Sequence, residues 1–148
     1  MTNAETYMRD HERHAKARKE LGKVNKVAIF DALAAANITE VVVEFNGEGD
    51  QGQIEFVGMI RNGERVDAPA TSVTLRRASW GSDEHVIDQV PLKDAIETLC
   101  YDFLEDEHGG WENNDGAFGD FHFDVEDRTV HLAFTERYSD TLTTDHTF

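Results

Sequence analysis

The stretch 44–55, EFNGEGDQGQIE, gathers the residue types that could bind a cation or a basic group. It contains three glycines and four carboxylates. Its acidic, Asn and Gly spacing is similar to that of an EF-hand calcium loop, although the flanks are strand-like and position one is Glu. Three interpretations therefore remain open: a tight turn with glycines at positive φ, an acidic tip facing a basic partner, or a Ca²⁺ or Mg²⁺ site formed by Glu44, Asn46, Glu48, Asp50 and Glu55.

The hydrophobic pattern predicts that two strands flank this stretch and pair with each other. Aligning their apolar residues sets three pairs opposite one another: Phe45/Ile54, Val43/Phe56 and, between them, Glu44/Glu55. Directly opposed like charges destabilise a sheet. We therefore expect water, a cation or a basic partner to relieve this pair.

A second acidic cluster, EDEHGGWENNDGAFGD, occupies residues 105–120. Trp111 is expected there either as an aromatic anchor within an acidic rim, which is typical of a binding hot spot, or as a cover over the end of the preceding helix. The predicted partner-binding residues of the two clusters are Glu44, Glu48, Asp50, Glu55, Glu105, Asp106, Glu107, Trp111, Glu112, Asp115 and Asp120.

Residues Asp120, His122, Asp124 and His131 are predicted to share the outer face of a hairpin. Two His and two Asp side chains suit a transition metal or acid–base chemistry. Strand alternation alone also explains them, as a solvated face on which Asp124 pairs with His131. We find no phosphate-binding loop, serine-hydrolase motif or zinc-protease motif, and no particular carboxylates are selected as catalytic, so the sequence favours a protein that is not an enzyme.

The formal net charge of the 148-residue chain is −16, and its distribution is uneven. Residues 1–26 carry seven basic and four acidic side chains, so the rest of the chain is strongly acidic. Such a surface repels nucleic acid and anionic membranes and favours a basic partner, although acidity can also serve solubility alone. Cys100 is the only cysteine, which excludes an intrachain disulfide and favours a cytoplasmic location.

The predicted fold class is α+β, in three parts. Residues 1–22 are expected as a basic polar helix, residues 23–138 as a single domain, and residues 139–148 as a polar tail that frays. Within the domain we expect a second helix over 23–36, strands over 40–45, 53–60 and 71–80, a helix over 91–107, and a hairpin over 117–138 centred on Asp127 and Arg128. The sum is two N-terminal helices, an antiparallel sheet of four to five strands built from hairpins, and one helix packed on it.

Two segments, FNGEGDQGQIE at 45–55 and GGWENNDGAFGDFHFDV at 109–125, resemble an uncharacterised family of small acidic domains found on bacterial phages, plasmids and other mobile elements. The resemblance covers residues 38–138. It implies a context in which many small acidic proteins inhibit host defences, as anti-CRISPR and anti-restriction proteins do, some by mimicking DNA.

The leading hypothesis is a non-enzymatic inhibitor that presents a DNA-mimicking carboxylate surface to a basic nucleic-acid-binding protein, without binding nucleic acid or membrane itself. One alternative is a divalent-cation-binding domain or metal-dependent enzyme that uses the 44–55 stretch. Another is a structural protein that dimerises through the N-terminal helix.

Overall fold

The computed structural model describes residues 3–48, 51–78, 85–111, 116–137 and 141–148. These residues form two helices and eight strands. In chain order the elements are α1 (Asn3–Ala35), β1 (Glu40–Glu48), β2 (Gln51–Arg61), β3 (Glu64–Val66), β4 (Ser72–Ala78), β5 (His85–Pro91), α2 (Leu92–Glu107), β6 (Ala117–Asp124), β7 (Thr129–Arg137) and β8 (Thr141–Thr147).

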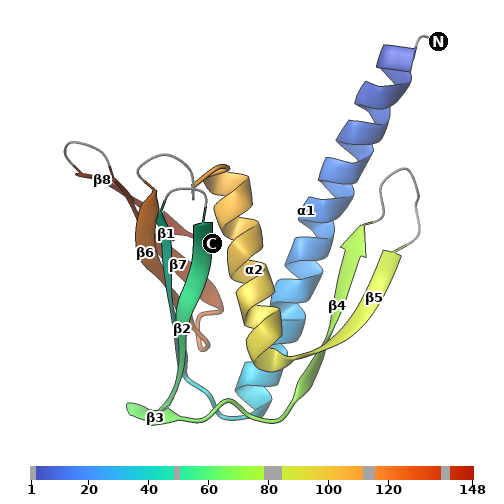
Figure 1. Cartoon of the computed structure of the whole chain (residues 1–148). Coiled ribbons are helices and arrows are strands. Elements are labelled where there is room, and N and C mark those ends of the chain that lie inside the picture. The colour runs from blue at the N-terminus through green and yellow to red at the C-terminus, as the bar shows by residue number, and fades with distance from the viewer. Residues whose placement is uncertain (1–2, 49–50, 79–84, 112–115, 138–140) are drawn as a thin grey trace.

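A six-stranded antiparallel sheet, in the order β3-β2-β1-β6-β7-β8, is the centre of the fold. Both helices lie on one side of it, with α2 between the sheet and α1 (Figure 1). We call the helix-covered side the inner face and the opposite side the outer face. Inner-face residues of β1, β6 and β7 such as Val43, Phe121 and Leu132 are fully buried, as alternation along these strands predicts.

The N-terminal region is one continuous helix, so the predicted break at Gly22 is wrong. Glycine inside a helix costs about 1 kcal/mol relative to alanine, which is too little to end a helix whose following turns are anchored. Leu21, Ile29, Phe30 and Leu33 of α1 are all buried. The predicted end is confirmed, because Asn37 adopts the left-handed conformation (φ 60°) just beyond the last turn.

A second, two-stranded sheet of β4 and β5 packs beside α1 (Figure 1). The strand predicted over 71–80 is confirmed, with Val73 and Leu75 buried, but β5 was not predicted. Asn25 of α1 fixes the sheet to the helix: its side chain donates to the Arg76 carbonyl and accepts from the Arg76 amide, both at 2.9 Å. These differences in helix and strand placement overturn the predicted fold arrangement, although its helices and antiparallel sheet remain.

The C-terminal residues form an edge strand, so the predicted fraying of 139–148 is wrong. Strand β8 pairs with β7 along its whole length. Phe148 exchanges two backbone hydrogen bonds with Val130 (2.7 and 3.1 Å), and its ring stacks on Phe103 of α2 at 4.4 Å. The polar strand is held by its backbone hydrogen bonds to β7, by polar side-chain contacts with β7 and His108, and by the terminal aromatic ring.

Strand registers differ from the predictions at two places. In the β6–β7 hairpin, Phe123 opposes Val130 and Phe121 opposes Leu132, a two-residue shift that keeps every side chain on its predicted face. The turn is longer than expected because Val125 donates its amide to the Thr39 carbonyl instead of pairing with Val130.

In the β1–β2 hairpin, Phe45 opposes Ile54 as predicted, but a β-bulge then shifts the register. Glu44 consequently opposes Phe56, and Val43 opposes Val57. The predicted Glu44/Glu55 pair is therefore wrong. The extra residue of the bulge also turns Val57 and Met59 toward the inner face, where the predicted pairing had placed Phe56.

Candidate partner-binding face

Carboxylates gather on the outer face, where β1 and β6 run side by side. The register sets Glu40 directly opposite Asp124 and Glu44 directly opposite Asp120. Asp145 of β8 lies on the same face, opposite Ala133, which in turn opposes Asp120. We call Glu40, Glu44, Asp120, Asp124 and Asp145 the outer acidic face.

The sequence predicted that Glu44 would oppose another carboxylate, Glu55. In the structure Glu44 does oppose a carboxylate, but that carboxylate is Asp120. Opposed residues in an antiparallel pair have Cβ atoms roughly 5 Å apart. The two pairs stand four residues apart along the strands, which is about 13 Å. The outer acidic face thus carries closely spaced negative charges, which lower the stability of the folded protein unless another group neutralises them.

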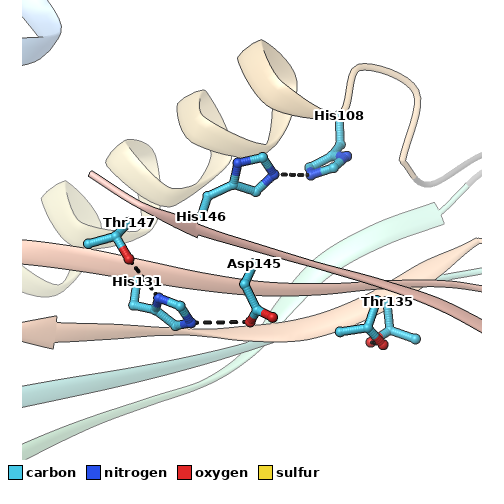
Figure 2. A network of polar contacts seen from close by, with 7 residues as sticks. His108, His131, Thr135, Asp145, His146 and Thr147 are labelled. Carbon is cyan, nitrogen blue, oxygen red and sulfur yellow. Dashed lines mark hydrogen bonds and ion pairs between the residues drawn. The ribbon is translucent and has the colours of Figure 1, made fainter.

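Histidines lie among these carboxylates. His122 Nε2 lies 3.5 Å from Glu40 Oε1, and His131 Nε2 lies 3.2 Å from Asp145 Oδ1 while its Nδ1 contacts the Thr147 hydroxyl at 2.9 Å. Figure 2 shows the second group on β7 and β8. The predicted Asp124–His131 pair is wrong, because Asp145 comes from a strand that was expected to fray. Asp124 instead accepts a hydrogen bond from the Asp127 amide at 3.1 Å.

Two aromatic side chains flank the central carboxylates. Phe118 precedes Asp120 on β6 and is 37% exposed, with the Arg137 guanidinium 4.7 Å from its ring centre. Phe56, opposite Glu44, has Arg65 at 4.3 Å. An exposed aromatic ring beside unneutralised carboxylates is the composition of a binding hot spot. The sequence analysis did not select Phe118, Phe56 or Glu40 as site residues. Strand alternation could have identified Phe118, because it lies two residues before Asp120 and therefore on the same face.

The 44–55 stretch does not form an EF-hand loop. Strand pairing continues to Glu48 and Gln51, so the twelve residues lie in a hairpin and not in a loop that wraps an ion. Asn46 faces Gln53 and Phe118, and its buried Oδ1 has no hydrogen-bond partner in the described part of the chain. Asp50 lies outside the described residues. Within those residues no group of three or more His, Cys, Asp or Glu side chains is arranged to hold a metal ion.

The second predicted cluster is divided between the two sides of the sheet. Asp120 belongs to the outer acidic face, whereas Glu105, Asp106 and Glu107 lie on the last turns of α2, on the helix side. Glu112 and Asp115 lie outside the described residues. The acidic residues were predicted as one surface because they are close in sequence, but Glu105, Asp106 and Glu107 belong to a helix on the inner side, whereas Asp120 belongs to a strand of the sheet and points outward.

Trp111 does not form an exposed anchor. Its side chain is only 8% exposed and meets Phe45 edge to face, with ring centres 5.4 Å apart. The alternative interpretation, in which the indole folds back onto the sheet, describes this position. The exposed aromatic residue among the described residues of the outer face is instead Phe118.

A pair of imidazoles lies on the helix side of β8. His108, which follows α2, and His146 contact each other through their Nε2 atoms at 3.0 Å (Figure 2). The ring of His108 also stacks on Phe134, with ring centres 3.7 Å apart. Burial lowers the pKa of His108, and the neighbouring His146 lowers it further against the opposing effect of Glu136 and Glu107. In Figure 2 His146 and Asp145 leave β8 on opposite sides, so this pair is separate from the outer acidic face.

Cys100 is fully buried in α2, and burial raises the pKa of its thiol well above the usual value. The neutral thiol is unreactive. This agrees with the predicted role of Cys100 as a small core residue, and it removes the only cysteine of the chain as a candidate nucleophile.

Comparison with known protein families gives one match. Residues 21–148 match a family of unknown function, DUF6878. The chain belongs to the DUF6878 family. The matched region begins inside α1 and includes β8, so it extends beyond the predicted 38–138 at both ends, while most of the basic N-terminal half of the helix lies outside it. No curated protein and no solved structure matches the chain. The expectation that the chain belongs to an uncharacterised family is thus confirmed, whereas the link to mobile elements stays a prediction.

Proposed function

We propose that this protein is a binding protein whose outer acidic face occupies a basic groove of a nucleic-acid-binding partner. The observation that supports it is the presence of two pairs of directly opposed carboxylates, Glu40/Asp124 and Glu44/Asp120. Both pairs lie on a sheet face that neither helix covers (Figure 1). Arginine or lysine side chains of a partner would relieve that repulsion. Charge complementarity of this kind gives fast association that weakens with salt.

The same arrangement favours mimicry of DNA over general acidity. The carboxylates stand in pairs about 13 Å apart along the strands, with an exposed aromatic ring at one end of the row. A phosphate backbone carries one negative charge per about 3.4 Å of helix axis on each strand, so the two carboxylate pairs would take the place of phosphates at two separated points of a basic groove. We propose that the protein acts in the cytoplasm as an inhibitor of a host defence system, in keeping with the resemblance to domains of mobile elements. Among the described residues, no helix is both long and apolar enough to span a membrane.

The test compares two variants with the same change in net charge. The first neutralises the outer acidic face at four positions: Glu40→Gln, Glu44→Gln, Asp120→Asn and Asp124→Asn. The second neutralises four exposed acids elsewhere: Glu64→Gln, Asp67→Asn, Asp94→Asn and Glu105→Gln. A fluorescently labelled arginine-rich peptide, free and bound to a DNA duplex, serves as the probe, with binding and DNA displacement followed by anisotropy.

We expect the outer-face variant to bind the peptide at least tenfold more weakly and to displace DNA poorly, because the opposed pairs are lost. The control variant should change by less than threefold. Equal losses in the two variants would show that net charge alone drives binding, and the proposed interface would be wrong.

We also propose that α1 can mediate self-association, because its N-terminal turns extend beyond the rest of the protein (Figure 1). Tyr7 and Met8 are each 62% exposed on this segment. Light scattering of the wild type and of a Met8→Glu variant tests this. A monomeric mass for the wild type at all concentrations would refute it.

A further inference from the structure

A groove of about 530 Å³ runs between α1 and α2, on the helix side of the molecule. Leu99, Phe103 and Phe148 line it with apolar surface, which we call the apolar floor. Phe103 and Phe148 stack with ring centres 4.4 Å apart, so the floor is held by contacts of its own. A volume of this size lies within the range of sites for small organic ligands.

The acidic residues along the α2 side of this groove already have partners. Arg18 of α1 lies 3.6 Å from an oxygen of Asp102 and 3.1 Å from one of Asp106. Glu107 lies 4.0 Å from His146 Nδ1. These contacts reduce the negative potential on that side, although Asp102 retains a raised pKa, first because of burial and then because of Asp106, against the effect of Arg18.

The α1 side carries three further cations, Lys19, Lys23 and Lys26, which we call the lysine wall. No carboxylate of the described residues lies within 4.0 Å of their ammonium groups. Lys26 is half-buried with its ammonium 5.9 Å from the Phe30 ring centre, and burial lowers its pKa. These cations have no carboxylate partner within the described ranges, although the chain has a net charge of −16.

Gly22 keeps the groove open at the centre of the helix. It lines the groove between Lys19 and Lys23, and no atom would lie within 4 Å of a Cβ added to it. The described structure therefore gives no packing reason for a glycine there, although glycine weakens the helix by about 1 kcal/mol relative to alanine. A side chain at this position, which lines the groove, would enter open space.

We propose that this groove binds a small amphipathic anion, whose single carboxylate or sulfonate lies on the lysine wall and whose apolar body lies on the apolar floor. The unpaired ammonium groups supply the charge that selects an anion, and the stacked rings supply the surface that excludes an inorganic ion. This site is separate from the outer acidic face, because it lies on the opposite side of the sheet, and it does not depend on the proposed function.

The test uses the full chain with anilinonaphthalene sulfonate as a fluorescent probe, followed by displacement with laurate. We expect saturable binding of the probe, displacement by laurate, and little displacement by the uncharged dodecanol or by inorganic sulfate. Absence of saturable binding, or equal displacement by dodecanol, would overturn the proposal.

Two sets of variants place the site. Lys23→Glu should weaken probe binding at least fivefold, whereas Lys16→Glu, the same charge change at an exposed position of α1 outside the groove, should change it less than twofold. Gly22→Leu should abolish binding without lowering the unfolding temperature, because leucine fills the open space and favours the helix. Equal effects of the two lysine variants, or unchanged binding in Gly22→Leu with its fold intact, would refute the groove as the site.

Discussion

The opposed pair Glu44/Asp120 makes a measurable prediction: neutralising either carboxylate should stabilise the protein, and the two effects should not add. With Cβ atoms about 5 Å apart, two unit charges in water repel by about 0.8 kcal/mol. A Debye length of about 8 Å at physiological ionic strength reduces this to about 0.4 kcal/mol. At 10 mM salt about 0.7 kcal/mol should remain, and at 1 M less than about 0.2 kcal/mol.

A double-mutant cycle of Glu44→Gln and Asp120→Asn isolates this term. Urea is the appropriate denaturant because it is uncharged, so the ionic strength can be set independently at each of the three salt concentrations. Each single variant should be more stable than the wild type, and the double variant should gain less than the sum of the two single gains. The shortfall is the coupling energy of the pair.

A matched cycle of Glu44→Gln and Glu126→Gln provides the control. Glu126 lies in the turn after β6, six residues beyond Asp120, and therefore farther from Glu44 than one Debye length at physiological salt. Its coupling to Glu44 should be close to zero under that condition. A Glu44/Asp120 coupling of zero, or one that does not fall as salt rises, would refute the view that the outer acidic face stores electrostatic repulsion.

Three further predictions concern the fold. Because the pKa of His108 is lowered in the folded state, the unfolded chain binds a proton more readily. The free energy of unfolding should therefore be highest above about pH 6.5 and fall below it. In urea titrations a His108→Gln variant should lose less of this free energy between pH 7 and 5. Phe148→Ala should cost about 2 kcal/mol, roughly half the value for a fully buried Phe, because its stack on Phe103 is half-exposed, and the urea midpoint measures this loss. Gly119→Ala should cost about 3 kcal/mol or prevent folding, since the added methyl would lie 2.0 Å from the Ala133 carbonyl oxygen, and a wild-type unfolding midpoint would contradict it.

Local signals predicted the elements whose hydrophobic pattern is complete within one segment. Helix α2 repeats apolar residues at helical spacing, and all six of its buried residues lie on one side. The dipeptide Asn62-Gly63 is itself a strong hairpin signal, and both residues adopt positive φ in the turn between β2 and β3, because few other residues adopt that conformation at low cost. The predicted inner and outer residues of β6 and β7 are also confirmed. Alternation along a strand assigns them without knowledge of the partner strand.

Long-range contacts decided the features that were predicted wrongly. Gly22 suggested a helix end, but the buried residues after it extend α1 through that position. The polar segment 141–147 has no hydrophobic pattern and becomes a strand only because β7 presents a free edge to it. The bulge at Glu55 was also invisible, because both registers align Phe45 with Ile54 and differ only in the pairs that Glu44 and the residues before it form with β2.

The candidate site shows the same division. The amino-acid sequence by itself determined that the body is acidic, that carboxylates alternate onto one face of its strands, and that Glu44 meets another negative charge. Only the tertiary structure decided that this charge is Asp120 and that Glu40 and Asp124 form a second opposed pair. It also placed residues 105–107 on the inner side of the sheet. Alternation sets the face of each side chain within a strand, whereas the opposing residue depends on hydrogen bonds between segments some 75 residues apart.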